Sequence, residues 1–372
     1  MKKVVLVIAI AVFGFGVWYL NKESGEGNEV GVNPIVDRQF GGDDIRLPDD
    51  TERSQDQRKD PDTAAKNTGL VKELNSSDLT NEINDNNQSE LASQTIAEPV
   101  IDTADNTANI VQITYPDDRV IAFYGNFYSS RMGILGEYSK DQVLNRLTDV
   151  VDQWQSIDPN TRHIPAVHYI ASTAQPDPTA NGLYTLRMPP GQILTAIQMG
   201  KEVGGVTFLD LQIGQATLLD EVRILEPYLH LPDVHLGIDP EFAMSDDEIP
   251  GELIGTIDAD EINVVIDYLV RIVRANNLPP KTIVIHRFTE NMLTNVSKIN
   301  SVPEVNVVIN MDGWGSPELK FSTYQNVISN YPIALSGYKI FYKNDLRTPS
   351  TRLTTIAEVL GLDPVPVYIQ YQ

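Results

Sequence analysis

The sequence predicts an α/β protein whose main domain is a (β/α)₈ barrel, preceded by an N-terminal membrane helix and a disordered acidic linker. Three observations lead to this fold class. Residues 1–20 are apolar after two lysines, residues 21–109 are polar and acidic, and residues 110–372 alternate eight strand-like runs with helix-like segments. Eight strand–helix units in about 260 residues match the size and rhythm of such a barrel.

The first segment has the features of a membrane anchor. Val4–Leu20 carries no charged residue, and at 1.5 Å per residue it makes a helix of about 25 Å, near the low end of a membrane span. Lys2 and Lys3 before it predict a cytoplasmic N-terminus. The run ends in Trp18 and Tyr19 rather than in a small-residue cleavage site. We therefore expect an uncleaved single-pass anchor in the cell membrane with an extracytoplasmic C-terminal domain; the alternative is a cleaved signal peptide and a secreted protein.

The second segment, residues 21–109, is expected to be a disordered spacer. It holds eight Lys or Arg against twenty Asp or Glu, and Phe40 is its single aromatic residue. Such a composition cannot bury enough apolar surface to offset the entropy of the unfolded chain.

The composition of the whole chain excludes several classes of function. The chain carries 28 Lys and Arg against 51 Asp and Glu, a formal net charge of −23. This balance argues against a nucleic-acid partner, which requires basic surface. There is no cysteine, so disulfides, thiolate metal sites and cysteine nucleophiles are excluded. We expect a monomer with no cofactor, and no phosphate-binding glycine motif is present.

The third segment, residues 110–372, is the barrel domain. The alternative is a doubly wound open sheet, but Gly125-Asn126-Phe127 after the first strand is not the expected GxGxxG turn. The expected strands are Val120–Phe127, Ala166–Ser172, Val206–Ile213, Val234–Phe242, Thr282–Phe288, Val305–Asp312, Ala334–Tyr342 and Val365–Tyr371. The expected helices include Lys140–Trp154, Gly191–Val203, Leu218–Tyr228 and Ala259–Ala275, the last with Asp258 as its N-cap.

Polar side chains gather where four successive strands end. Catalytic groups of such barrels lie at the carboxyl ends of the strands, and residues two apart in a strand share a face. The third to sixth strands place on one face, in order, Asp210 and Gln212, then Asp239 and Glu241, then His286, then Asn310, Asp312 and Trp314.

Clustered carboxyl groups raise one another's pKa values, so that a neutral acid can stand beside an ionised partner. A neutral carboxylic acid and an ionised carboxylate together cleave glycosidic bonds in glycoside hydrolases. We expect Glu241 to be the acid because its longer side chain can reach over the lumen, and Asp239 to raise its pKa and orient it. Asp312 or Asp210 would complete the set as base or stabiliser.

Further side chains near the same rim are expected to bind substrate. Aromatic rings can stack on sugar rings, and polar groups can orient them. These residues are Gln212, His286, Trp314, Tyr124, Tyr169 and Tyr371.

The Asp239-Pro240-Glu241 motif on the fourth strand resembles that of the chitinase-type and lysozyme-type barrel glycosidases. The resemblance implies acid catalysis by this pair, and the closing run Val367–Tyr371 is similar to the last strand of the lysozyme type. Two features depart from the pattern. The chitinase type has two further aspartates before the pair, where this chain has Asp233, His235 and Gly237, and the lysozyme type has an aspartate on the first strand, which is missing here.

A second resemblance, to uncharacterised secreted bacterial proteins, covers most of the barrel. It is carried by Met132–Glu137, Gly237–Met244 and Ile257–Asn263. It implies an exported protein and adds Glu137 to the substrate-binding candidates at the rim.

The leading hypothesis is therefore a cell-surface carbohydrate-active hydrolase that acts on peptidoglycan or another wall glycan. Two alternatives remain open. One is metal-dependent hydrolysis, in which a divalent cation such as Mg²⁺ or Mn²⁺ is held by oxygen-rich ligands that include His286. The other is a glycan-binding or wall-scaffolding barrel without catalysis. The ligands of the metal alternative are Asp210, Asp239, Glu241, His286 and Asp312.

Overall fold

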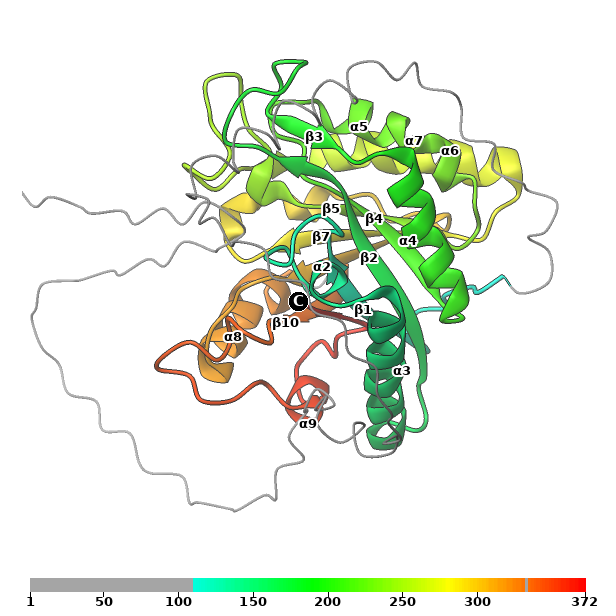
Figure 1. The fold of residues 1–372 in the computed structure, drawn as a ribbon, viewed down its shortest axis with the longest axis vertical. Coiled ribbons are helices and arrows are strands. Elements are labelled where there is room, and N and C mark those ends of the chain that lie inside the picture. The colour runs from blue at the N-terminus through cyan, green and yellow to red at the C-terminus, as the bar shows by residue number, and fades with distance from the viewer. Residues whose placement is uncertain (1–109, 332–333) are drawn as a thin grey trace, which may run out of the picture. The chain divides into compact units, whose positions relative to one another are not determined.

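Eight parallel strands close into a barrel, and helices cover its outside (Figure 1). The computed structural model describes residues 110–331 and 334–372. The barrel strands are β1 (Asp118–Gly125), β2 (Arg162–Ala174), β4 (Val206–Leu211), β5 (Val234–Ile238), β7 (Lys281–Arg287), β9 (Val305–Met311), β10 (Leu335–Ile340) and β11 (Tyr368–Tyr371).

The ring closes where the last strand pairs with the first. Strand β11 lies between β10 and β1 in parallel register, with Val120 opposite Tyr368 and Ala122 opposite Gln370. In Figure 1 the C-terminus accordingly lies beside β1 and β10. The predicted barrel is confirmed, each expected strand-like run overlaps one of its strands, and the doubly wound alternative is wrong.

An α-helix lies between most successive strands of the ring, as expected, but only short 3₁₀ turns and a two-residue strand lie between β7 and β9. The α-helices are α2 (Ile134–Glu137), α3 (Lys140–Ile157), α4 (Pro190–Glu202), α5 (Leu218–Ile224), α6 (Glu226–Leu229), α7 (Ala259–Asn276), α8 (Pro317–Tyr324) and α9 (Ile356–Leu360). Asp258 caps α7 as predicted, since its side chain accepts a hydrogen bond from the backbone of Asp260. None of the helices in the described residues combines the length and apolar composition that a membrane crossing requires. The predicted anchor 1–20 and linker 21–109 lie outside the described residues.

The helix expected over Leu218–Tyr228 is two helices instead. Helix α5 ends at Ile224, and α6 begins at Glu226 with Pro227 in its first turn. Proline has no N–H to continue the hydrogen-bond ladder, so it begins a new helix rather than extending the old one.

Three short strands and several 3₁₀ or π turns lie outside the eight-stranded ring and were not predicted. Strand β3 pairs antiparallel with the end of β2, and β6 pairs with β8 in a separate two-stranded sheet. Their bounds, with those of the short 3₁₀ and π turns, are β3 (Thr185–Arg187), β6 (Ile257–Asp258), β8 (Leu293–Thr294), η2 (Pro240–Phe242), η3 (Glu290–Met292), η4 (Val296–Lys298) and η5 (Gln325–Ser329).

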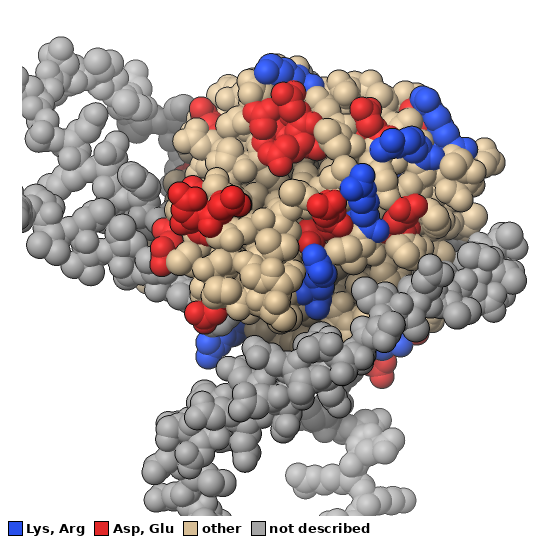
Figure 2. Space-filling view, turned by 90° about the horizontal axis from the view of Figure 1, so that it is seen from above, with Lys and Arg blue, Asp and Glu red and all other residues tan. Residues whose placement is uncertain are grey.

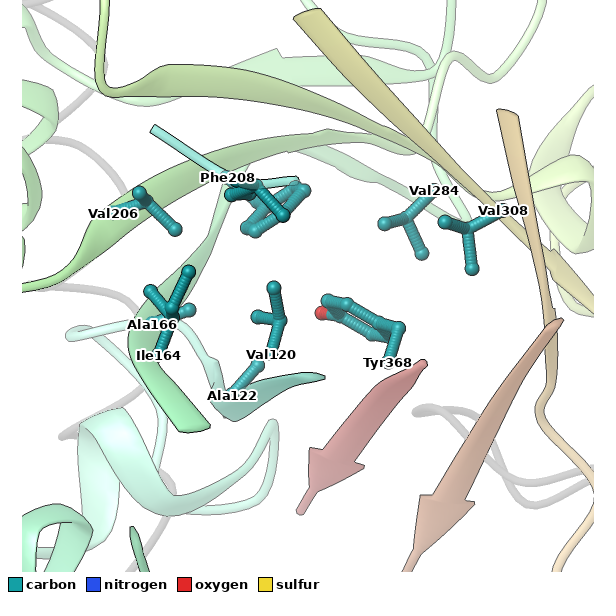
Figure 3. Close-up of a cluster of buried hydrophobic side chains, with 10 residues drawn as sticks. Val120, Ala122, Ile164, Ala166, Val206, Phe208, Val284, Val308 and Tyr368 are labelled. Carbon is teal, nitrogen blue, oxygen red and sulfur yellow. The ribbon is translucent and has the colours of Figure 1, made fainter. Parts of the chain in front are cut away.

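Inward side chains fill the lumen in layers. Figure 3 shows apolar side chains that converge from strands around the lumen. Two residues further along six of the strands, the inward positions carry polar groups, because side chains alternate between lumen and helix layer. The apolar group comprises Ile113, Val120, Ala122, Ile164, Ala166, Val206, Phe208, Val284, Val308 and Tyr368. A packed floor thus lies beneath a polar upper layer.

Acidic and basic side chains both occur on the face drawn in Figure 2. On the face drawn in Figure 2, Asp and Glu form several groups, Lys and Arg lie between and beside them, and most of the surface is uncharged. This face has no continuous basic area.

Helix α3 shows how the outer layer is held to the barrel. Ser139 caps it in a capping box with Gln142, which satisfies free N–H groups of the first turn. Trp154, fully buried near its end, packs onto the strands, and its indole Nε1 donates to the Tyr371 hydroxyl at 2.8 Å. The sequence spacing that places Trp154 inward leaves Ile157 at the exposed helix end.

We expect Trp154→Ala to lower the free energy of unfolding by about 3–5 kcal/mol, because it leaves a cavity and removes a buried hydrogen bond. Urea denaturation measures this change. Ile157→Ala on the same helix is the control and should change stability by less than about 0.5 kcal/mol. Equal effects of the two substitutions would contradict the packing described.

Candidate active site at the carboxyl end of the barrel

The polar upper layer of the lumen brings together side chains from six strands or strand ends. Because parallel strands all run the same way, their carboxyl ends meet at one mouth of the barrel. The connected side chains are Tyr124 from β1, His168 from β2, Asp210 from β4, His286 from β7, Asp312 just after β9 and Lys339 from β10.

Asp210 lies at the centre of this group and is completely buried. Its Oδ2 accepts a hydrogen bond from the Tyr124 hydroxyl at 3.0 Å. Its Oδ1 lies 3.2 Å from His168 Nε2 and 3.4 Å from His286 Nε2. One carboxylate therefore faces three side chains that come from three different strands.

The network continues from His286 towards β10. His286 Nδ1 lies 2.9 Å from Asp312 Oδ2, and Lys339 Nζ lies 2.9 Å from the other oxygen, Asp312 Oδ1. The same ammonium group stands 4.1 Å from the centre of the Tyr124 ring, a distance at which a cation is attracted to an aromatic face. Two acids and two cationic partners thus alternate across the lumen.

Strand β11 supports the network from below. The Tyr368 hydroxyl lies 2.5 Å from His168 Nδ1 and also accepts from the Gln370 amide at 3.2 Å. Gln370 in turn accepts from Asn310 Nδ2 at 3.4 Å. The contacts of Tyr368 with His168 and of Gln370 with Asn310 join β11 to other strands, so they depend on the closed ring.

Asp239 and Glu241 lie at the mouth but not on a strand, which corrects the sequence prediction. Strand β5 ends at Ile238, and Pro240–Phe242 forms a 3₁₀ turn. Pro240 cannot donate to a strand ladder, and Asp239 Oδ1 instead accepts from the backbone N–H of Glu241 at 3.2 Å. Asp239 Oδ2 accepts from Gln212 Nε2 at 3.4 Å. Asp239 is buried, and Glu241 is half-buried.

Cations keep two of the carboxyl groups ionised. Burial by itself would raise the pKa of Asp210 and Asp312, but His286 beside both, His168 beside Asp210 and Lys339 beside Asp312 lower it below the ordinary value. Burial would likewise lower the pKa of His286, yet the two carboxylates overcome it and raise the pKa to about 10. Burial prevails at His168 and lowers its pKa to about 4.

The other two carboxyl groups are held in the opposite state. Burial, with the negative charges of Asp210 and Asp312, raises the pKa of Asp239 to about 7. Burial is the largest cause, and the negative charge of Asp239 the second, of a pKa of Glu241 well above its ordinary value. Glu241 therefore keeps its proton to higher pH than Asp210 and Asp312.

Several predicted substrate-binding residues lie elsewhere. Tyr169 is on the helix-facing side of β2, where its hydroxyl donates to Gln192 of α4. Tyr371 accepts from Trp154 under α3. Trp314 lies beyond the end of β9, with the Arg347 guanidinium 5.3 Å from its ring centre. Alternate strand positions face opposite sides, so Tyr169 and Tyr371 belong to the outer packing layer.

Glu137 lies at the end of α2 and pairs with Lys343 Nζ at 2.5 Å. This ion pair joins the loop after β1 to the loop after β10. The predicted residues that the structure does bring to the network are Tyr124, Asp210, Gln212, Asp239, His286 and Asp312, with Glu241 beside them.

The sequence prediction missed His168 and Lys339. The sequence contains a signal for each residue. His168 lies on the same strand face as the inward Ala166, and Lys339 lies within an otherwise uncharged strand. A buried lysine or histidine is costly unless it has a polar partner, and its alignment with the inward face would have placed it in the lumen.

A cavity of about 410 Å³ lies beyond the ends of β4 and β5. Its walls include Ile213, Ala243 and Met244, with the carboxyl-bearing Glu248 and Glu261. It adjoins the mouth, because Gly255 in its wall donates its N–H to the Glu241 carbonyl at 2.8 Å.

Comparison with known proteins gives no family for the chain. No protein-family model and no curated protein matches it. Among solved structures, a ligand-free mutant form of tryptophan synthase from M. tuberculosis shares 10% sequence identity, covers 68% of this chain and 82% of that chain, and has a TM-score of 0.30. That similarity is too low to bear on activity. The strands and their side chains define the class: an α/β barrel with a buried ionic centre at its carboxyl end.

Gly237 is required for this centre to form. A Cβ atom there would lie 2.2 Å from Asp210 Oδ1 and 2.4 Å from His168 Nε2. We expect Gly237→Ala to destabilise the protein by about 1–3 kcal/mol through overpacking. Thermal or urea unfolding measures it, with Gly191→Ala, whose Cβ meets nothing within 4 Å, as the neutral control. A Gly237→Ala protein as stable as the control would contradict the close approach of these groups.

Proposed function

We propose that the chain is a cell-surface hydrolase of glycans, with peptidoglycan or another wall glycan as substrate and Glu241 as the general acid. The observation that carries the proposal is the pair Asp239 and Glu241 at the mouth of the barrel, where Glu241 keeps its proton while Asp210 and Asp312 are ionised. Glycosidic cleavage requires this combination of a neutral acid and an ionised carboxylate.

In the proposed reaction Glu241 donates its proton to the glycosidic oxygen as the bond to the anomeric carbon breaks. Glu241 is half-buried and therefore within reach of a substrate, whereas Asp239 behind it is almost fully buried. Asp239 acts as a positioning residue, because it accepts the backbone N–H of Glu241 and its negative charge raises the pKa of that acid.

The second carboxylate of the reaction is assigned to Asp312. Asp210 is 0% exposed and shielded by three side chains, while Asp312 retains 8% exposure at the end of β9. An ionised carboxylate there can take a proton from the attacking water or stabilise the positive charge that develops on the sugar ring. Asp210 then serves to hold His168, His286 and Tyr124 in place.

The proposed location at the cell surface rests on the sequence of the N-terminal segment. An anchor over residues 1–20 with a spacer over 21–109 would hold the barrel outside the membrane, where a wall glycan is accessible.

We expect Glu241→Gln to reduce the release of reducing ends from purified wall glycans by about 10²–10⁴-fold, the usual contribution of general acid catalysis. The amide keeps the shape of the side chain but cannot donate a carboxyl proton. Glu252→Gln, an exposed change on the same loop, is the matched control and should retain full activity. Binding of glycan without turnover by the wild type would favour the non-catalytic alternative instead.

The raised pKa of Glu241 also predicts the direction of the pH dependence. The acid must be protonated, and burial holds its pKa well above the ordinary value of 4.5. We expect kcat/KM to persist through weakly acidic pH and to fall as pH rises through the raised pKa. Initial rates measured across pH test this. A loss of activity that begins near the ordinary value of 4.5 would show that Glu241 is not the acid.

A further inference from the structure

Three buried atoms face one another around the centre of the lumen without a hydrogen bond. They are His168 Nε2, Asp210 Oδ1 and His286 Nε2, and none of them has a hydrogen-bond partner. All three side chains are 0% exposed, and the three atoms lie within 4.8 Å of one another. A buried polar atom without a partner is costly, so this convergence calls for a ligand.

The remaining polar atom of each side chain is fixed by a neighbour. Asp312 Oδ2, which can only accept, lies 2.9 Å from His286 Nδ1, so Nδ1 keeps its proton whether or not a metal is bound. In the metal-free protein His286 is an imidazolium, and a metal ion bound at Nε2 would displace the second ring proton. The Tyr368 hydroxyl is hydrogen-bonded to His168 Nδ1, and the Tyr124 hydroxyl donates to Asp210 Oδ2. Outer groups that orient histidine and carboxylate ligands are typical of metal sites.

The distances also fit a metal better than direct pairing. Charge-assisted hydrogen bonds between such groups are about 2.7–2.9 Å long, whereas the separations here are 3.2 and 3.4 Å. Ligand atoms arranged tetrahedrally at zinc distances of about 2.0–2.2 Å stand roughly 3.3–3.6 Å apart. The two separations from Asp210 Oδ1 are thus close to two edges of a zinc coordination tetrahedron.

We propose that His168, Asp210 and His286 bind one divalent metal ion of the zinc type. Two imidazole nitrogens and one carboxylate oxygen favour zinc over magnesium, which prefers oxygen ligands. Three protein ligands leave a fourth position for water, and a metal lowers the pKa of bound water so that it can act as a nucleophile.

This site is distinct from the ligand set considered from the sequence alone, which contained a single histidine and favoured Mg²⁺ or Mn²⁺. His168 supplies the second nitrogen, and Asp239 and Glu241 lie outside the three converging atoms. The proposal goes beyond glycan hydrolysis and does not require it, because metal binding is measured without turnover.

The test uses the full-length chain without a histidine tag, purified in mild detergent and stripped with a chelator. Because the ligands are inaccessible to solvent, Zn²⁺ or Mg²⁺ is added both to the folded protein and during refolding from urea. After dialysis, elemental analysis is expected to find one zinc ion per chain and no bound magnesium. His168→Asn and His286→Asn should abolish binding, while His230→Asn, a change on the exposed surface, should keep one ion.

Tyr368→Phe keeps the ring in the core and removes only the hydroxyl that orients His168. It provides a test if the ligand variants fail to fold, and its affinity for Zn²⁺ should be about 10–100-fold weaker than that of the wild type. The proposal is overturned if the wild type binds no zinc in stoichiometric amount, if His168→Asn retains the ion, or if Tyr368→Phe binds zinc as tightly as the wild type. A zinc-binding protein without glycan hydrolysis would leave this site intact and refute only the proposed function.

Discussion

The pairing of β11 with β1 is the constraint on which the rest of the structure depends. It turns an open sheet into a ring, so the inward side chains pack against one another and can meet solvent only at the mouth of the barrel. The register that sets Val120 opposite Tyr368 also carries the Tyr368 hydroxyl to His168 on the far side of β1. Without this closure the buried imidazoles and carboxylates would face solvent, and burial would no longer shift their pKa values.

Within the ring, the distribution of cations decides the state of each acid. Asp210 and Asp312 have His286 and Lys339 as neighbours, so they remain ionised despite burial. At Asp239 and Glu241 burial prevails over the nearby cations and raises both pKa values. The hydrogen bonds that Asp239 accepts come from the Gln212 amide and from the backbone N–H of Glu241. One lumen thus contains both forms of the same functional group. The proposed metal site lies at the centre of this lumen, where atoms of His168, Asp210 and His286 converge.

Much of this could be predicted from the sequence, because periodicity is local. Apolar runs gave the eight strands, and alternation along each strand placed Asp210, His286 and Asp312 on the inward face. What could not be predicted depends on contacts between distant segments. Strand β5 ends at Ile238 rather than Phe242. On the closing strand β11, Tyr368 faces the lumen and Tyr371 faces the helices, and the register of the closed ring sets which tyrosine faces which side.

The most direct test of the central claim is the protonation state of Glu241 in the folded protein. Carboxyl ¹³C resonances of the full chain, labelled at glutamate and kept metal-free with a chelator, are followed against pH. The signal missing from Glu241→Gln identifies the residue. We predict that it titrates well above the ordinary value of 4.5 and is still protonated at weakly acidic pH. A midpoint near 4.5 would contradict the account, because the mouth would then hold no neutral acid.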